Sequence, residues 1–466
     1  MQIFVVGALV CAGLLIVGYY QRATVIVALI ASFAFGSTAI ATIESLGGAS
    51  PLIFTVFAAL LLVSIPLRRH ALHDLGVALT RSGAPWIIGS LILYTTLGAI
   101  ILPRLFAGQT TAFVPSRVSG EVFELPLAPV SGNITQTGYF SLGALVFLAL
   151  SILLTRRNKL QMIRRGFFTL CVLHVALGFV DLTGKLIGAG DVLMPVRSAS
   201  YALATNVEEA GFFRIAGGYS EASAFGGVAL ACLAFTSTYW RRTRSFLAFA
   251  LSIALIVLLA LSTSTTAYVG LTIISLPLVA SIIRSILVGR LSGEDLILVA
   301  LVSLCVTIAL AIYLYNSEVF APVIKLFEAT ILNKSSSLSG QERAYWNLKS
   351  LQSLFDTAGL GIGLGSSRSS SWIISVLSQF GAIGAFLMAA LVVDLMRGLG
   401  QKSARSDLEI VAIHDGVRAF ALLWLMAAAI AGGGADPGLL FFVSLATVIA
   451  CRQQVSRGHV TSTGTS

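Results

Sequence analysis

Long apolar runs recur along the whole chain, separated by short polar connections. Each run approaches the roughly 20 residues that a helix needs to cross a bilayer. The runs lack the alternation of polar and apolar residues that membrane barrel strands show. The pattern predicts an all-α polytopic membrane protein with about 12–13 transmembrane helices, and the last two runs are short enough to form a re-entrant pair instead. The thirteen runs cover residues 3–20, 23–43, 51–67, 84–106, 139–155, 166–187, 222–240, 246–261, 267–287, 296–315, 372–395, 417–431 and 438–451.

The composition supports the same class of protein. Of the 466 residues, 57% are hydrophobic and 11% are Asp, Glu, Lys or Arg, and the mean hydropathy is +0.93. An ordinary soluble domain is about 45–50% apolar and about 25% charged, and a soluble core cannot bury this excess. The composition excludes a soluble enzyme, a disordered scaffold and a disulfide-rich secreted module. The opening MQIF lacks the basic segment of a cleaved signal peptide, so we expect a retained first helix.

Basic residues concentrate on one predicted side of the membrane. If all thirteen runs cross, 20 of the 30 Lys and Arg residues fall in connections on the same side. This asymmetry places that side in the cytoplasm, with the N-terminus outside and the C-terminus inside. The net charge of +10 then reflects membrane topology and gives no support to nucleic-acid binding. The basic residues predicted to lie outside are Arg104, Arg117, Lys185, Arg197, Arg214, Lys325, Lys334, Arg343, Lys349 and Arg368.

Three predicted outer segments, residues 107–138, 188–221 and 316–371, are too long to be plain turns. Long connections in compact proteins are usually functional or disordered. The predicted organisation is a transmembrane part with the first two segments (1–315), a large outer loop (316–371), C-terminal transmembrane helices (372–451) and a cytoplasmic tail (452–466).

The second outer segment ends in a cluster of candidate functional residues. The sequence GFFRIAGGYSEASAFGG places Arg214 seven residues before Glu221. Arginine grips phosphate bidentately, and a carboxylate at the mouth of a span is costly unless it is paired or functional. Arg214 is therefore a candidate for anion binding, with a structural Arg214–Glu221 pair as the alternative. Asp181 and Lys185 lie one helical turn apart in the sixth run, where they can neutralise each other.

The third outer segment contains a predicted amphipathic helix. The sequence QERAYWNLKSLQSLF begins near Arg343 and has apolar residues at Leu348, Leu351 and Phe355, which is helical spacing. Trp346 in this helix suits a membrane interface. Arg343 is the second candidate for anion binding.

A glycine-rich run, GLGIGLGSSRSS, follows this helix and contains Arg368. No strand precedes it, so it is not a dinucleotide fingerprint. It forms either a tight loop with close backbone packing or a backbone nest for phosphate. The hydroxyls of residues 262–266 form either a plain polar turn or part of a sugar-facing surface. No CxxC pair and no His/Glu pattern on a helix is present, so neither a metal nor a cofactor is expected.

Three blocks of the chain resemble the bacterial O-antigen polymerase and ligase superfamily, of the Wzy and WaaL types. FRIAGGYSEASAFG is similar to the family's Arg, Gly, aromatic and Ser-x-Glu block before a span. LLALSTSTTAYVGL is similar to its Leu-Ser corner, although Thr265 and Thr266 stand where an Arg is usual. GQERAYWNLKSLQSLFDTAGLGIGLG is similar to the block in its large periplasmic loop, and fifteen residues separate Arg343 from Gly359, as in the R-x15-G spacing of polymerases. The many spans and the large late outer loop extend the resemblance over nearly the whole chain.

The resemblance implies a GT-C-like membrane glycosyltransferase in the bacterial inner (plasma) membrane. Such an enzyme polymerises undecaprenyl-pyrophosphate-linked oligosaccharide repeat units into O-antigen or exopolysaccharide at the periplasmic face, without a metal. A flippase and a chain-length regulator would be its partners. The resemblance implies that Arg214 and Arg343 bind the pyrophosphate and that Glu221 serves the acceptor as a base or a sugar-binding group. The further residues expected to bind substrate are Arg197, Arg368, Gly359 and Trp346.

Other functions stay open. An O-antigen ligase would transfer the glycan to lipid A-core or another acceptor. Ligases of the superfamily carry a functional His in the large outer loop, and residues 316–371 contain none, which favours a polymerase. A lipid-linked oligosaccharide flippase or another transporter would more often show internal repeats and broken helices with intramembrane charges, and no clear repeat is visible. A purely structural membrane protein would leave the outward-facing arginines without a role.

Overall fold

The computed structural model describes residues 2–43, 50–116, 121–155, 158–200, 208–209, 212–289, 337–399 and 407–463, with isolated positions between 293 and 328. The helices are α1 (Val5–Tyr20), α2 (Thr24–Ala31), η1 (Ser32–Phe35), α3 (Ile53–Val63), α4 (Ala71–Arg81), α5 (Ala84–Leu105), α6 (Ser131–Leu153), α7 (Asn158–Leu186), η3 (Met194–Val196), α8 (Ala222–Thr243), α9 (Phe246–Leu261), α10 (Thr265–Leu287), α13 (Leu338–Asp356), α14 (Trp372–Met396), α15 (Leu408–Ala431) and α16 (Leu439–Thr463). The antiparallel strand pairs are β1 (Gln2–Ile3) with β2 (Ala41–Thr42), β3 (Thr111–Pro115) with β4 (Val122–Pro126), and β5 (Glu208–Glu209) with β6 (Phe212–Phe213).

The described part of the chain contains seven helices that are long and apolar enough to cross a membrane, namely α5, α6, α7, α8, α14, α15 and α16. Shorter apolar helices are α1, α2 with η1, α3, α9 and the first part of α10. Each of these helices falls on one of the predicted apolar runs. The predicted run at 296–315 lies largely outside the described residues. The protein is therefore an all-α polytopic membrane protein, as the sequence pattern predicted.

The structure decides the open alternative for the last two runs and shows that one other predicted span is wrong. The last two runs do not form a short re-entrant pair, because α15 and α16 are helices of 24 and 25 residues. Both helices continue beyond the apolar runs into polar sequence, which hydropathy alone does not register as part of a span. The run at 23–43 is not one continuous helix, because α2 ends at Ala31 and residues 41–42 pair with β1 instead.

The centre of the protein is built around α8, which packs against α9, α10 and α15, while α16 packs between α6 and α15. In the most apolar 18-residue stretches of α8 and α16, 78% of the residues are buried, compared with 33% in the corresponding stretch of α5. Small residues make the close helix contacts possible, as is typical in membranes. A Cβ atom added at Gly227, for example, would lie 3.2 Å from the Cβ of Ala427 on α15.

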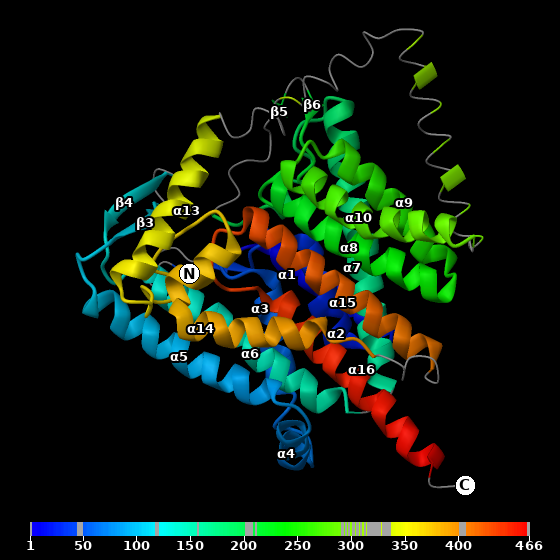
Figure 1. The fold of residues 1–466 in the computed structure, drawn as a ribbon, viewed down its shortest axis with the longest axis horizontal. Coiled ribbons are helices and arrows are strands. Elements are labelled where there is room, and N and C mark those ends of the chain that lie inside the picture. Colours follow the sequence, from blue (N-terminus) through cyan, green and yellow to red (C-terminus); the bar gives the residue numbers. More distant parts are fainter. Residues whose placement is uncertain are drawn as a thin grey trace.

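The molecule has two distinct ends (Figure 1). One end carries the β3–β4 hairpin and α13, and is called the hairpin end. The opposite end carries α4 and the C-terminal part of α16. Helices α4, α8 and α10 all have basic residues in their last turns, so this end is called the basic end. By the positive-inside rule the basic end is expected in the cytoplasm.

Candidate functional site

A cavity of about 390 Å³ opens at the hairpin end, between the starts of α8, α14 and α16 and the end of α15. Residues of η1 and α3 close its other side. Most of the lining is apolar or glycine, and the carboxylates of Glu221 and Asp436 are its acidic groups. A largely apolar hollow with a few placed polar groups is the usual form of a small-molecule site. We therefore take this cavity as the candidate functional site.

The two carboxylates come from different loops at the mouth of the bundle. Glu221 directly precedes α8, is half-buried, and accepts a hydrogen bond of 2.5 Å from the hydroxyl of Ser223. Asp436 lies in the loop between α15 and α16, where the amide of Gly438 donates to its Oδ1 at 2.9 Å. Burial raises the pKa of the Asp436 carboxyl to about 6, because removal from water disfavours the charged form. Asp436 is thus poised to exchange a proton near neutral pH.

Two tryptophans hold the Asp436 loop in place and line the cavity. The indole of Trp372, at the start of α14, donates to the carbonyl of Ala435 at 3.1 Å. The indole of Trp424, on α15, donates to the carbonyl of Pro437 at 2.7 Å. Each ring has its polar edge satisfied and its apolar body beside the cavity. Amphipathic rings of this kind suit a site that is partly apolar and partly wet.

Arg368 connects the rim of the cavity to α13. Its side chain lies against Gly433, where an added Cβ would be 3.2 Å from the Arg368 Nε. The amide of Ser369 donates to the carbonyl of Gly433 at 3.2 Å. The guanidinium of Arg368 also lies over the ring of Trp346, 5.8 Å from its centroid, within the usual range of a cation–π contact. Two of the predicted substrate-binding residues, Arg368 and Trp346, are therefore in contact.

Arg343 lies on the same face of α13 as this contact. It precedes Trp346 by three residues and Asn347 by four, and such positions are neighbours on a helix surface. The side chain of Asn347 accepts a hydrogen bond of 2.9 Å from the amide of Ser370. This face of α13 therefore turns toward residues 368–370. Arg343 is half-buried, and no ion pair of the described residues involves it.

The β3–β4 hairpin fixes the other side of α13. Tyr345 donates to a carboxylate oxygen of Glu124 at 2.8 Å, and Thr111 donates to the other oxygen at 2.8 Å. These two hydrogen bonds lower the pKa of Glu124, because they stabilise its charged form. The carbonyl of Phe113 accepts from the amide of Arg368 at 2.8 Å. The hairpin thus positions both α13 and Arg368.

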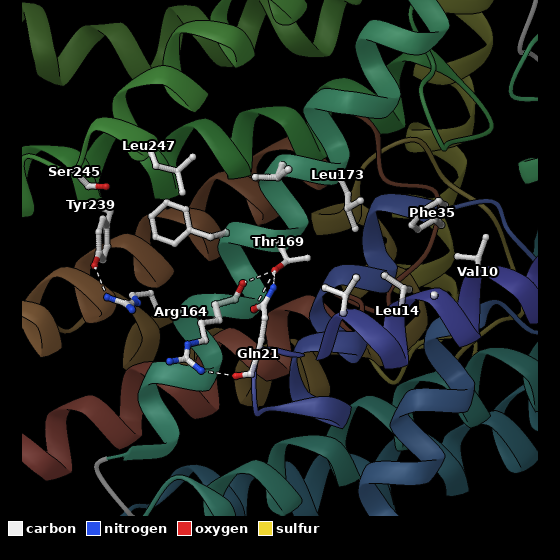
Figure 2. Close-up of a pocket in the computed structure, with 15 residues that line it drawn as sticks. Val10, Leu14, Gln21, Phe35, Arg164, Thr169, Leu173, Tyr239, Ser245 and Leu247 are labelled. Carbon is white, nitrogen blue, oxygen red and sulfur yellow. Dashed lines mark hydrogen bonds between the residues drawn. The ribbon is translucent and has the colours of Figure 1, made fainter. Parts of the chain in front are cut away.

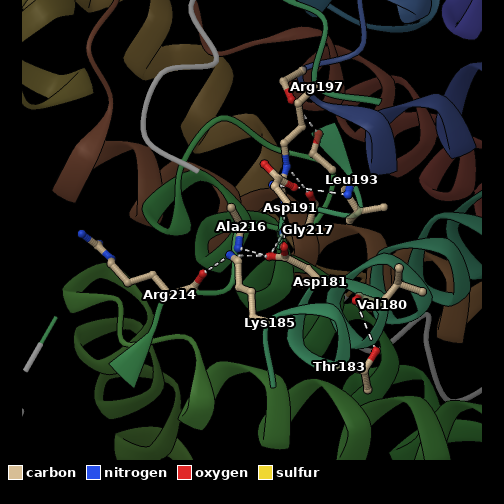
Figure 3. A network of polar contacts seen from close by, with 12 residues as sticks. Val180, Asp181, Thr183, Lys185, Asp191, Leu193, Arg197, Arg214, Ala216 and Gly217 are labelled. Carbon is tan, nitrogen blue, oxygen red and sulfur yellow. Dashed lines mark hydrogen bonds and ion pairs between the residues drawn. The ribbon is translucent and has the colours of Figure 1, made fainter. Parts of the chain in front are cut away.

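A buried ionic network lies beneath the second outer segment (Figure 3). Asp181 on α7 is paired with Lys185 at 3.2 Å, as the sequence predicted, and with Arg197 at 2.9 Å. Arg197 is also paired with Asp191 at 2.5 Å, and its side chain is 2% exposed. The Nε of Arg197 donates to the carbonyl of Gly217 at 2.8 Å. Arg197 therefore anchors the segment that leads to Glu221 and does not reach the cavity surface.

Arg214 contributes its backbone to the same network. Its carbonyl accepts a hydrogen bond of 2.6 Å from Lys185 Nζ, whereas its half-buried side chain points away from the network (Figure 3). Arg214 does not line the cavity. Among the described residues, the side chain of Glu221 contacts Ser223. The sequence offered an Arg214–Glu221 ion pair as an alternative role for these two residues, and this pair is not formed in the described part of the chain.

The glycine-rich run docks on a break in α14. At Gly381 the backbone leaves helical geometry, with φ of 64° and ψ of −170°. The amide of Ile362 donates to the carbonyl of Ser378 at 2.9 Å on one side of the break. On the other side, the amide of Ala382 donates to the carbonyl of Gly359 at 2.8 Å. The run therefore satisfies the backbone groups that the break exposes.

This docking explains the glycines better than a phosphate nest does. At Gly361 φ is +83°, and a Cβ would come within 2.6 Å of the Gly381 amide nitrogen. The amides of the run also donate within the protein, from Gly359 to the Leu354 carbonyl, from Gly361 to the Thr357 hydroxyl, from Gly363 to the Gln379 carbonyl and from Gly365 to the Gln379 side chain. Gly359 thus takes part in loop docking, and close packing is the supported hypothesis.

The hydroxyl-rich corner at 262–266 is a buried turn. Ser262 donates to the carbonyl of Leu259 at 2.8 Å, and Ser264 caps α10 by accepting from the amide of Ala267. Both serines are 0% exposed. This burial supports the plain polar turn over a sugar-facing surface.

A larger pocket of about 810 Å³ lies between α1, α7 and α9 (Figure 2). Its arginines are already engaged, because Arg164 pairs with Glu409 and contacts the hydroxyl of Tyr239 at 3.4 Å. Arg165 donates to the carbonyl of Gln21. The remaining lining is mostly apolar, so this pocket offers less reactive chemistry than the cavity at the hairpin end.

Sequence inspection did not single out Asp436, Trp372 or Trp424. A usable signal was present for Asp436, which stands in GGGADPG between the last two apolar runs. A carboxylate at the mouth of a span is costly, and the same reasoning had identified Glu221. The tryptophans carry no comparable signal, because tryptophan at a membrane interface is common.

Comparison with protein-family models finds no match for this chain, and comparison with curated proteins finds none either.

Proposed function

We propose that the protein polymerises lipid-linked oligosaccharides by glycosyl transfer in the cavity at the hairpin end. The main support is the convergence of groups there: two carboxylates in an aromatic-lined cavity, with Arg368 at its rim and Arg343 on the adjoining helix face. The substrate class comes from the motif resemblance, in which the donor and acceptor are repeat units carried on undecaprenyl pyrophosphate.

The proposed reaction forms one bond and breaks one. A hydroxyl oxygen of the acceptor glycan attacks the anomeric carbon of the donor glycan. The bond between that carbon and the pyrophosphate oxygen breaks, and undecaprenyl pyrophosphate leaves with the electron pair. The proton of the attacking hydroxyl passes to a carboxylate. Pyrophosphate is already a good leaving group, so positioning and charge stabilisation are the main requirements.

Asp436 suits the role of proton acceptor. A base works best when its pKa is near the working pH, and the pKa of Asp436 is raised to about 6 by burial. Glu221, which is hydrogen-bonded to Ser223 at the same cavity, then orients the acceptor sugar. This assignment moves the base from Glu221, the sequence candidate, to Asp436.

Arg343 and Arg368 suit the binding of the pyrophosphate. Guanidinium groups match phosphate geometry and keep their charge when partly buried. Arg368 is oriented by the ring of Trp346, and Arg343 lies one turn earlier on the same helix face. Arg214 remains a candidate for a second contact at the membrane surface, while Arg197 acts from the buried network by positioning the loop before Glu221.

The proposed location is the inner membrane of a bacterium, with a GT-C-like arrangement in which the hairpin end faces the periplasm. The last turns of α4, α8 and α10 then place Arg81, Arg241 and Arg284 in the cytoplasm, in agreement with the positive-inside rule. A flippase would supply the lipid-linked units and a chain-length regulator would act on the product.

The broken helix α14 is a feature of the described residues that favours a transporter, because transporters use discontinuous helices to bind substrates at the membrane midplane. In this protein the break at Gly381 is filled by backbone of the glycine-rich run. The backbone polar groups at the break therefore form hydrogen bonds with the glycine-rich run and are not presented to a transported substrate.

Replacing Arg343 by Ala in cells tests the proposal. We expect loss of polymer, with single lipid-linked units accumulating at the outer face. Lys349→Ala is the matched control, because the ammonium of Lys349 lies 6.0 Å from the ring of Tyr345 and interacts with Glu124 of the hairpin. Accumulation of units inside the cell would instead indicate transport, and normal polymer from Arg343→Ala would contradict the site.

A further inference from the structure

A second hollow, of about 1140 Å³, lies at the basic end, at the opposite ends of α14 and α16 from the cavity. Its walls come from α5, α14 and α16, and the last residue of α4 completes its rim. We call it the basic groove. Nothing in the proposed polymerase reaction uses it.

The charged groups of the basic groove are three arginines and one aspartate. Asp394 on α14 pairs with Arg397 at 3.4 Å and with Arg452 on α16 at 3.1 Å. Arg81, in the last turn of α4, is exposed at the rim. One carboxylate therefore faces three guanidinium groups, which leaves an excess of positive charge. The α5 helix also begins in the groove, at Ala84, and a helix start carries partial positive charge.

The wall of the basic groove is apolar and faces the surface. Phe386 and Val393 on α14 are 73% and 52% exposed, and Ile87 and Ile449 continue the wall on α5 and α16. Such exposed side chains on a membrane-spanning helix lie where acyl chains run. A site for a free anion would not need an extended apolar wall beside its arginines.

The short helix α4 marks the level of the membrane surface. It has a polar face with Asp74 and Arg81 and an apolar face with Leu75 and Ala78, the pattern of a helix that lies in the interface. Its packing against α6 and α5 fixes Arg81 beside the groove. The arginines of the groove are thus at the depth of lipid headgroups.

We propose that the basic groove binds one anionic phospholipid from the cytoplasmic leaflet. The headgroup phosphate lies among Arg81, Arg397 and Arg452, and the acyl chains lie along the wall formed by α5, α14 and α16. Basic pockets between helices on the cytoplasmic side recognise anionic headgroups by this charge complementarity. A bound lipid would join α4 to α14 and α16, which are themselves linked at this level by the ion pair between Arg452 and Asp394.

The test compares lipids and variants on the purified full-length protein in detergent. Binding of phosphatidylglycerol and of phosphatidylcholine is measured by native mass spectrometry and by the shift in unfolding temperature. We expect phosphatidylglycerol to bind more tightly and to raise the unfolding temperature more. The double variant Arg81→Gln/Arg397→Gln should bind it at least about tenfold more weakly. Arg452 is left in place because it is mostly buried against Asp394.

The double variant Arg68→Gln/Arg69→Gln is the matched control, since both residues are exposed, precede α4 and do not line the groove. It should bind phosphatidylglycerol as the unaltered protein does. Equal weakening in both double variants would overturn the proposal, because it would show unspecific attraction. Equal binding of the two lipids, or displacement of phosphatidylglycerol by millimolar inorganic phosphate, would also overturn it.

Discussion

Arg197 and Asp181 form an ion pair of 2.9 Å inside the protein, with side chains that are 2% and 1% exposed. The pair joins α7 to the second outer segment. The other oxygen of Asp181 accepts from the amides of Ala216 and Gly217 at 2.8 and 3.0 Å. One carboxylate thus fixes the segment that ends at Glu221, and the geometry of the cavity depends on a residue that does not line it.

Replacing Asp181 by Asn should therefore destabilise the protein. Removing one partner of a buried ion pair typically costs about 3–5 kcal/mol, because the remaining charge stays buried and uncompensated. Arg197 would keep its ion pair with Asp191, while Lys185 would lose its ion pair with Asp181. Thermal unfolding in detergent measures the loss. The control Asp74→Asn, on the surface helix α4, should change stability little, and an unaltered unfolding temperature for Asp181→Asn would contradict the role of the network.

The docking of the glycine-rich run predicts unequal effects at two similar glycines. Gly359 and Gly361 have nearly the same φ, +81° and +83°, but a Cβ at Gly359 meets open space while one at Gly361 meets the Gly381 backbone. Gly359→Ala should cost only the backbone strain, about 1–2 kcal/mol. Gly361→Ala should cost clearly more, because the loop must move off the break in α14. Equal unfolding temperatures for the two variants would refute the docking.

The raised pKa of Asp436 predicts a pH dependence. If Asp436 takes the proton from the acceptor, polymerisation should rise with pH through about 6 and be lost below it. The contribution of this group to stability has the opposite sign. Its pKa is higher in the folded than in the unfolded protein, so the folded state binds more protons, and stability falls as the pH rises from about 4 to about 6.

Asp436→Asn separates these two effects. The variant should lose polymerisation by roughly 10²–10⁴-fold, which is the usual contribution of a general base. It should at the same time unfold at an equal or higher temperature at neutral pH, because a buried charge is removed. Rates of polymer formation across pH 5–8, together with unfolding temperatures, provide the measurement. Full activity at neutral pH would show that Asp436 is not the base.

The sequence predicted the membrane fold well because apolar runs are a direct physical requirement of a bilayer. It predicted the Asp181–Lys185 pair, since residues four apart on a helix are neighbours. It did not predict that Arg197 is the third member of that network. The partner lies sixteen residues away across a loop, and only the folded path of the segment brings them together.

The candidate site was predictable only in part. Glu221, Arg368 and Trp346 were identified from local composition and from the motif resemblance, and the structure places them at or beside one cavity. The cavity itself is formed by segments from η1 to α16, so no local pattern describes it. The sequence alone also left two hypotheses open for Gly359, because a backbone nest for phosphate and a closely packed loop need glycine at the same positions.

Polymer formation by the purified protein tests the central claim most directly. Lipid-linked repeat units extracted from the host membranes are incubated with the protein in detergent. We expect products of increasing repeat number and release of undecaprenyl pyrophosphate. Arg343→Ala should reduce the rate by roughly 10²–10³-fold, as for the loss of one charge-stabilising donor, while Lys349→Ala should react normally. Unchanged repeat units with the unaltered protein, or normal polymer from Arg343→Ala, would contradict the account.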